Sequence, residues 1–290
     1  MNIRVIPRLD IKGPNLVKGI HFEGLRVLGK PEDFARYYYE NGADELYYVD
    51  AVASLYGRNS LLEIVERTAS EIFIPLAVGG GLRSADDIKT VLRAGADKVT
   101  LNTAAIERPE LIREASRKFG SSTIVVSIEA IKKDDGRYEA FTNYGRESTG
   151  VDALEWAIQA VELGAGELIV TSIIQEGTGN GYDLELIKKI AESVPVPVIA
   201  SGGAGTPQHV ADAVAMGQAD AVSMASILHY DCVGRFEYND QDFSGEGNVE
   251  FLQQRRGTFH IKGVTVQQIK SHMISQGIAC RPIMMDQAHV

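Results

Sequence analysis

The chain repeats itself: three short motifs recur in the same order at a separation of 122 or 123 residues. Three matches at nearly one offset argue against chance similarity. The sequence therefore predicts two copies of a unit of roughly 120 residues, far longer than a solenoid repeat. The paired segments are 42–46 with 164–168, the glycine runs 79–81 with 202–203, and 94–100 with 216–223.

Both copies alternate short apolar runs, typical of buried strands, with amphipathic segments, typical of helices. Strict alternation of strand and helix gives a parallel sheet, and eight strands within 290 residues favour a closed barrel over an open sheet. We predict the α/β class and a single (β/α)8 TIM barrel domain over residues 1–290, with an internal half-barrel duplication. The predicted strands are 3–10, 46–50, 76–78, 98–101, 123–129, 168–172, 197–201 and 219–224. The predicted helices are 31–41, one starting at Asn59, 84–94, 109–119, 152–163, 184–193, 207–216 and 264–276.

Four segments interrupt this alternation. Residues 11–30 are rich in glycine and charge, which predicts a mobile loop at 18–24, and residues 132–146 read as a hairpin. Polar residues at about 231–257 predict an insertion before the last helix, and about 277–290 a partly frayed tail. The insertion serves as a lid, as a partner surface or as a neutral excursion, and the sequence does not choose among them.

Composition excludes several classes of function. A net charge of −10 argues against nonspecific nucleic-acid binding. Two isolated cysteines, Cys232 and Cys280, predict no disulfide framework, and the six histidines show no metal-ligand spacing, so no metal or cofactor is expected. No signal peptide and no membrane-length apolar run are visible, which predicts a cytoplasmic protein without a membrane partner.

Polar residues end several predicted strands, where the active sites of such barrels lie. Asp10 and Glu129 end the first and fifth strands and face each other across the barrel mouth, an arrangement that suits general acid and base work. Two glycine loops, after the third and seventh strands, let backbone N–H groups cradle phosphates. We therefore predict a bisphosphorylated small molecule handled at its middle. The candidate binding residues are Asp50, Gly80, Gly81, Asn102, Thr103, Thr171, Gly202, Gly203, Ala225 and Ser226.

These motifs together resemble the cyclase subunit of imidazole glycerol phosphate synthase, from histidine biosynthesis. The resemblance covers about residues 1–230 and resumes in the last predicted helix. Its carriers are LDIK at 9–12, VKG at 17–19, DEL at 44–46, VGGG at 78–81, GADKV at 95–99, NTAA at 102–105, GAGE at 164–167, GT at 177–178, GYD at 181–183 and SGGAG at 201–205.

The resemblance implies a lyase that takes ammonia from a glutaminase partner. It cleaves and cyclises a bisphosphorylated ribulosyl aminoimidazole carboxamide compound, giving imidazole glycerol phosphate and aminoimidazole carboxamide ribotide. The family's catalytic carboxylates fall on Asp10 and Glu129, and further substrate contacts on Lys18, Glu176 and Gly177. Its ammonia gate is matched by Arg4, Glu45, Lys98 and Glu167, with Asp97 facing the glutaminase.

Three positions depart from the family pattern. Glu129 and Glu176 stand where the family has Asp, and Arg8 stands where a small residue is usual. One extra methylene moves a carboxyl group by about a bond length, and a misplacement of ~1 Å costs on the order of a hundredfold in rate. These departures suggest a divergent member and an alternative function, an ammonia-channelling subunit in acetamidino modification of a bacterial surface sugar. A binding protein without chemistry is a third reading.

Overall fold

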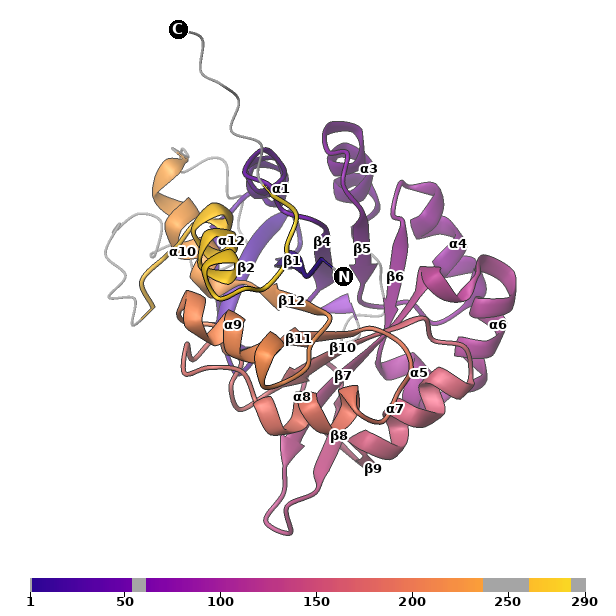
Figure 1. Cartoon of the computed structure of the whole chain (residues 1–290). Coiled ribbons are helices and arrows are strands. Elements are labelled where there is room, and N and C mark those ends of the chain that lie inside the picture. The colour runs from indigo at the N-terminus through magenta and orange to yellow at the C-terminus, as the bar shows by residue number, and fades with distance from the viewer. Residues whose placement is uncertain (1, 54–60, 237–260, 283–290) are drawn as a thin grey trace, which may run out of the picture.

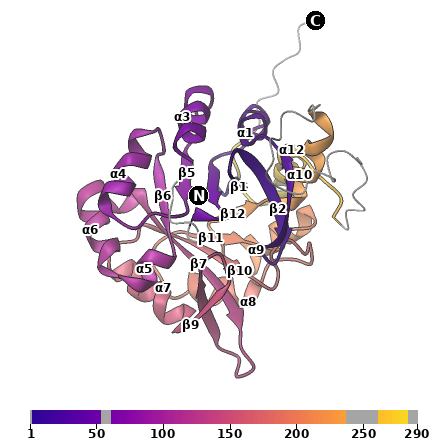
Figure 2. The ribbon, with the colours of Figure 1, turned by 180° about the vertical axis from the view of Figure 1, so that it is seen from behind.

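A closed barrel of parallel strands forms the centre of the molecule. The computed structural model describes residues 2–53, 61–236 and 261–282. Within these residues eight parallel strands pair in the order β1-β4-β5-β6-β7-β10-β11-β12, and β12 pairs back with β1, as Figures 1 and 2 show from opposite sides. The predicted (β/α)8 barrel is confirmed. Its strands are β1 Arg4–Lys12, β4 Leu46–Asp50, β5 Leu76–Gly79, β6 Lys98–Leu101, β7 Ile124–Lys132, β10 Glu167–Ser172, β11 Val198–Ser201 and β12 Ala221–Met224.

Helices cover the outside of the barrel (Figure 1). Each predicted helix from 31 onward has its counterpart, although the predicted start at Asn59 lies outside the described residues. The α-helices are α1 Pro31–Glu40, α3 Leu62–Glu71, α4 Ala85–Arg93, α5 Thr103–Glu107, α6 Glu110–Phe119, α7 Ala153–Glu162, α8 Leu184–Ala191, α9 Pro207–Ala215, α10 Ser226–Cys232 and α12 Val266–Ser275, with short 3-10 turns η1 Ser121–Thr123 and η2 Val233–Arg235. None of these described helices has the length and apolar character needed to cross a membrane.

The duplication is visible in repeated hydrogen bonds. Asp97 accepts from the backbone N–H of Leu76 at 2.9 Å, and Asp220, its counterpart in the second half, accepts from Val198 at the same distance. Ser84 caps α4 as Thr206 caps α9, each through a bond from the third helical residue. In both halves, therefore, an aspartate bonds to the first residues of a neighbouring strand, and a hydroxyl side chain caps the equivalent helix.

Alternation along each strand separates two apolar interiors. In β1, Val5, Leu9 and Ile11 pack outward against the helices, whereas Ile6 belongs to a second cluster inside the barrel. The same alternation turns three further even-numbered residues of β1, namely Arg4, Arg8 and Asp10, toward the barrel axis. Charged side chains thus lie at both ends of an axis whose middle layer is apolar, lined by Tyr47, Ala77, Val125, Ile169, Ile199 and Ala221.

The predicted mobile loop at 18–24 is wrong, because the segment forms a β-hairpin. β2 Asn15–Ile20 pairs with the extension of β1 beyond the barrel, and β3 Glu23–Gly29 pairs with β2. Buried Leu16 and Val17 anchor the hairpin, while Gly19 and the charges around it hid the alternation in the sequence. A second hairpin, β8 Tyr138–Thr142 with β9 Glu147–Asp152, confirms the prediction for 132–146.

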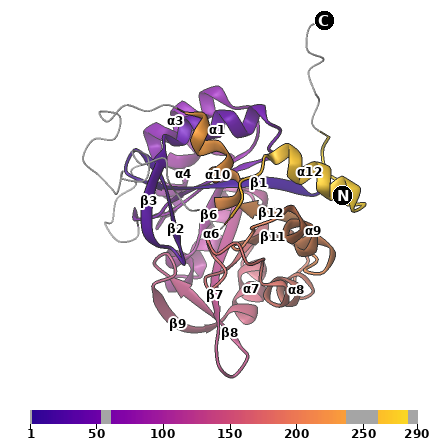
Figure 3. The ribbon, with the colours of Figure 1, turned by 90° about the vertical axis from the view of Figure 1, so that its left-hand side faces the viewer.

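Both hairpins lie at one end of the barrel, and the N-terminal residues and α12 lie at the other (Figure 3). Of the predicted insertion, residues 231–236 complete α10 and η2, and residues 237–257 lie outside the described residues. The tail is docked as far as it is described, because Ile3 donates its N–H to Ala279 and bridges Cys280. Residues 283–290 lie outside the described residues, so the predicted fraying there stays a prediction, as does the single-domain assignment.

Candidate active site

Asp10 and Glu129 occupy opposite strands at the hairpin end of the barrel. β1 and β7 are four positions apart in a ring of eight strands, so their side chains approach from opposite sides of the axis. Both are buried, Asp10 with no exposed surface and Glu129 with 5% of its surface exposed. A buried carboxyl group is stabilised either by cations beside it or by a bound proton. Asp10 has the cations and Glu129 has the proton.

Asp10 is held as an anion. Arg8 donates its Nε to one carboxylate oxygen at 2.9 Å, and Lys18 donates its Nζ to the other at 3.3 Å. Burial on its own raises the pKa of Asp10, but the two cations outweigh it and hold the pKa at about 2. Lys18 also pairs with Glu176. Asp10 is therefore charged at neutral pH.

Glu129 keeps its proton to a much higher pH than Asp10 does. Asn102 donates its Nδ2 to the carboxyl group at 3.1 Å. Burial raises the pKa of Glu129 to about 7, and the negative charge of Asp10 adds to this effect against the opposing charge of Arg8. Two carboxyl groups whose pKa values lie so far apart can serve one as base and the other as acid. Glu129 is the acid.

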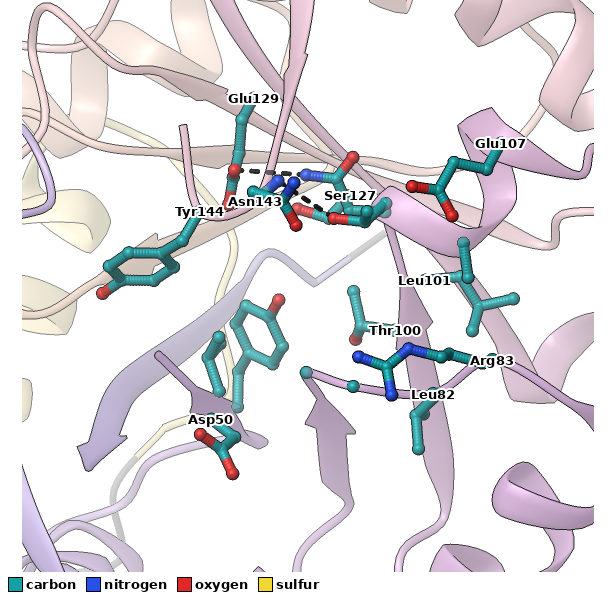
Figure 4. A pocket seen from close by; sticks show the side chains of 17 residues that line it. Asp50, Leu82, Arg83, Thr100, Leu101, Glu107, Ser127, Glu129, Asn143 and Tyr144 are labelled. Atoms are coloured by element: carbon teal, nitrogen blue, oxygen red, sulfur yellow. Dashed lines mark hydrogen bonds between the residues drawn. The ribbon is translucent and has the colours of Figure 1, made fainter. Parts of the chain in front are cut away.

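The first glycine loop borders a cavity of about 210 Å³. Glu129 and Asn143 lie on one wall, and Asp50 and Arg83 on the other (Figure 4). Gly80 has φ +100°, and a Cβ there would lie 2.6 Å from the carbonyl oxygen of Asp50, so chain packing alone already requires glycine. The predicted binding residues gathered here are Asp50, Gly80, Gly81, Asn102 and Thr103.

The second glycine loop borders a much smaller cavity, of about 10 Å³. This volume holds roughly one water molecule. Arg8 lines it together with residues predicted for binding, namely Glu176, Gly177, Gly202, Gly203, Ala225 and Ser226. Thr171 abuts this cradle, because a Cβ on Gly202 would lie 3.1 Å from its Cγ2.

The two cradles are separate cavities, and Asp10 lines neither of them. The guanidinium of Arg8 lies 5.1 Å from the centre of the ring of Phe22, 5.6 Å from that of Tyr47 and 6.0 Å from that of Tyr144. The rings of Phe22 and Tyr144 in turn are 4.3 Å apart. Tyr47 and Tyr144 line the first cavity and Arg8 lines the second, so the cluster borders both. The expected single cleft under both carboxylates is therefore not what the structure has.

Sequence reasoning missed Phe22, Tyr47 and Tyr144 as residues of the mouth. Tyr47 had an available signal, since it lies in β4 on the axis-facing side. Phe22 and Tyr144 had none, because both follow residues with positive φ in the turns of hairpins. Arg8 was noted only as a departure, although it shares the axis-facing side of β1 with Asp10.

A closed ring of charges lies at the opposite end of the barrel. Each member begins, or directly precedes, a barrel strand. Arg4 pairs with Glu45 at 2.5 Å and with Glu167, and Lys98 pairs with Glu45 at 3.1 Å and with Glu167 at 2.9 Å. Asp97 next to it is exposed, and its bond to Leu76 gives it a structural role as well.

One histidine lies elsewhere than expected. Most histidines were predicted to be solvated, but His229 is fully buried and its Nδ1 lies 2.6 Å from the hydroxyl of Tyr38. Burial lowers the pKa of His229 to about 3, so the ring is neutral. The described residues contain no group of His, Cys, Asp or Glu that could hold a metal ion. Cys232 and Cys280 are free and buried.

The closed barrel, with polar groups gathered at the carboxyl ends of its strands, places the chain among the (β/α)8-barrel enzymes. The model of a family described as histidine biosynthesis protein matches residues 4–233. The HisF subunit of imidazole glycerol phosphate synthase from Legionella pneumophila is 58% identical over 204 residues, which cover 70% of this chain and 96% of that protein. The HisF subunit from Methanocaldococcus jannaschii is 49% identical over 246 residues, 78% of this chain and 90% of that protein. The chain belongs to the HisF family of imidazole glycerol phosphate synthase subunits, which confirms the resemblance. Neither relative supports the surface-sugar branch.

Proposed function

We propose that this chain is the cyclase subunit of imidazole glycerol phosphate synthase. It uses ammonia to convert a bisphosphorylated ribulosyl aminoimidazole carboxamide compound into imidazole glycerol phosphate and aminoimidazole carboxamide ribotide. Membership of the HisF family supports the reaction. The observation that carries the proposal is the pair of carboxyl groups at the hairpin end of the barrel, with pKa values of about 2 and about 7. Glu129 lines the first cavity, and Asp10 bonds to Arg8, which lines the second.

In this proposal each carboxyl group carries out one proton transfer. The anionic Asp10 takes a proton from the nitrogen nucleophile or from the carbon next to the new bond. Glu129 donates its proton to the oxygen or nitrogen that leaves. Each transfer of this kind typically contributes about 10²–10⁴-fold to the rate. In this proposal each glycine cradle holds one phosphate, the second only after it widens, so that the reacting middle of the substrate lies near both carboxyl groups.

Ammonia reaches this site along the barrel axis in our proposal. Arg4, Glu45, Lys98 and Glu167 form the gate at the far end, and a glutaminase partner docks on that face against Asp97. The ion pairs of the gate support this role, because one swing of Lys98 away from its two carboxylates opens the ring. The buried hydroxyls of Ser127 and Ser223 have no hydrogen-bond partner among the described residues. In this proposal they form hydrogen bonds with ammonia on its way from the gate to the active site.

Complementation tests this function against its rival. A histidine auxotroph that lacks only its cyclase subunit should grow without histidine when it expresses this chain together with a matching glutaminase. The paired control is the same chain carrying Asp10→Asn, which should not restore growth.

One observation favours the alternative function, ammonia channelling for amidation of a surface sugar. The second cradle has space for roughly a single water molecule, and Arg8 occupies its edge. If the wild-type chain is expressed and folded but fails to restore growth without histidine, the result contradicts the cyclase proposal and supports the alternative function.

A further inference from the structure

Arg8 is a buried cation with unused hydrogen-bonding capacity. Its side chain is almost completely buried, with 1% of the residue exposed. Its Nε donates to Asp10, but Nη1 and Nη2 have no partner among the described residues. Leaving a charged donor unpaired in the interior is costly. A ligand that supplies acceptor oxygens would relieve this cost.

The surroundings of Arg8 indicate which side that ligand comes from. Phe22, Tyr47 and Tyr144 place aromatic rings around the guanidinium. Burial raises the pKa of both tyrosine hydroxyls, so they are neutral and this side offers no anionic oxygen. The second cradle is different: Arg8 lines it beside Gly202, Gly203 and Ser226. The buried hydroxyl of Ser226 also lacks a partner there. Two sets of unused polar atoms thus border one cavity.

We infer that Arg8 binds the substrate phosphate in the second cradle through its two terminal nitrogens. The inference rests on the proposed function and deepens it. A guanidinium presents a planar fork of N–H groups that matches two oxygens of a phosphate, and Ser226 adds a third contact. The second cradle is therefore a charged phosphate site in this chain, and Arg8 links it directly to Asp10.

Binding requires a local rearrangement. The cavity of about 10 Å³ is too small for a phosphate, and the carboxylate of Glu176 lines it. Glu176 would repel the phosphate and has to move out of the cavity, which breaks its ion pair with Lys18. Lys18 keeps its bond to Asp10. Arg8 stays in place because Asp10 and the aromatic rings hold it.

The two products test the inference, because each carries one phosphate and so reports on one cradle. Dissociation constants for imidazole glycerol phosphate and for aminoimidazole carboxamide ribotide are measured by calorimetry on the wild-type chain, Arg8→Gln and Arg8→Lys. Loss of a charge-assisted bond to phosphate weakens binding on the order of tenfold to a hundredfold. We expect Arg8→Gln to weaken one product by this factor and to leave the other within about twofold.

Arg83→Gln is the matched control, because Arg83 lines the first cradle. It should affect the other product. Arg8→Lys keeps the charge but loses the fork, so it should fall between wild type and Arg8→Gln. It also serves as the test variant if Arg8→Gln does not fold.

Three results would overturn the inference: no change in either product, an equal loss for both, or tighter binding of either. Tighter binding would mean that the guanidinium occupies the place of the phosphate. A wild-type chain that binds neither product contradicts the proposed function itself, which distinguishes the two failures.

Discussion

Replacement of Glu129 by Gln should change how stability depends on pH. The environment of Glu129 raises its pKa from 4.5 to about 7, so the folded chain holds a proton that the unfolded chain has already lost. Between these two pH values the free energy of unfolding of the wild type falls by about 1.4 kcal/mol per pH unit from this group alone. Over the whole window the loss amounts to roughly 3 kcal/mol. Glutamine does not titrate, so the Glu129→Gln variant does not lose this stability as the pH rises.

The assay compares urea unfolding of the two proteins at several values between pH 4.5 and 8. Trp156 is the sole tryptophan and is buried, so its fluorescence reports on the loss of the core. Other titrating groups cancel in the difference between the proteins. Asp10 does not interfere, because its pKa of about 2 lies below the window.

We expect the free energy of unfolding of Glu129→Gln, relative to wild type, to rise by roughly 3 kcal/mol from pH 4.5 to 8. A difference that stays constant within about 1 kcal/mol would refute the assignment of Glu129 as a protonated acid.

Three further predictions follow from the site and the fold. At a fixed concentration of free ammonia, kcat/KM should fall as pH rises through about 7, the pKa of Glu129, because the acid loses its proton; a rising limb there would reverse its role. Lys98→Met removes the cation that closes the ring, so the ring stays open: ammonium-dependent turnover should not fall, and glutamine-dependent turnover with the partner should persist; loss of turnover in both assays would contradict a gate that Lys98 opens by moving away. Gly203→Ala places a Cβ 2.1 Å from the carbonyl oxygen of Gly181 and should lower thermal stability well beyond Gly150→Ala, where nothing lies within 4 Å and φ is also positive; similar melting temperatures would show that the second loop yields easily.

The barrel was predictable because its signals are local and repeated. Strand β4 and strand β6 were placed residue for residue, since each apolar run is bounded by a charged or polar residue. The duplicated aspartates, Asp97 and Asp220, made the two halves recognisable before any contact was known. The hairpin of β2 and β3 was missed because its pairing depends on β1 continuing past the barrel, which no local pattern reveals.

The site was predictable as a set of strand ends but not as a shape. Strand-end position placed Asp10 and Glu129 at the mouth, because alternation along a strand fixes which side chains face the axis. It could not give their opposite protonation, which arises from Arg8, from Lys18 in the hairpin that follows β1, and from burial. Nor could it give the aromatic cluster between the cradles, which two separate hairpin turns bring together.

Turnover with ammonium as the nitrogen source tests the central claim most directly. The purified chain is supplied with the bisphosphorylated substrate and an ammonium salt, and both products are quantified by chromatography. We predict equimolar release of imidazole glycerol phosphate and aminoimidazole carboxamide ribotide by the wild type, and none by folded Asp10→Asn or Glu129→Gln. A folded wild type that releases neither product would contradict the cyclase activity. Variants that match the wild-type rate would contradict the roles of Asp10 and Glu129.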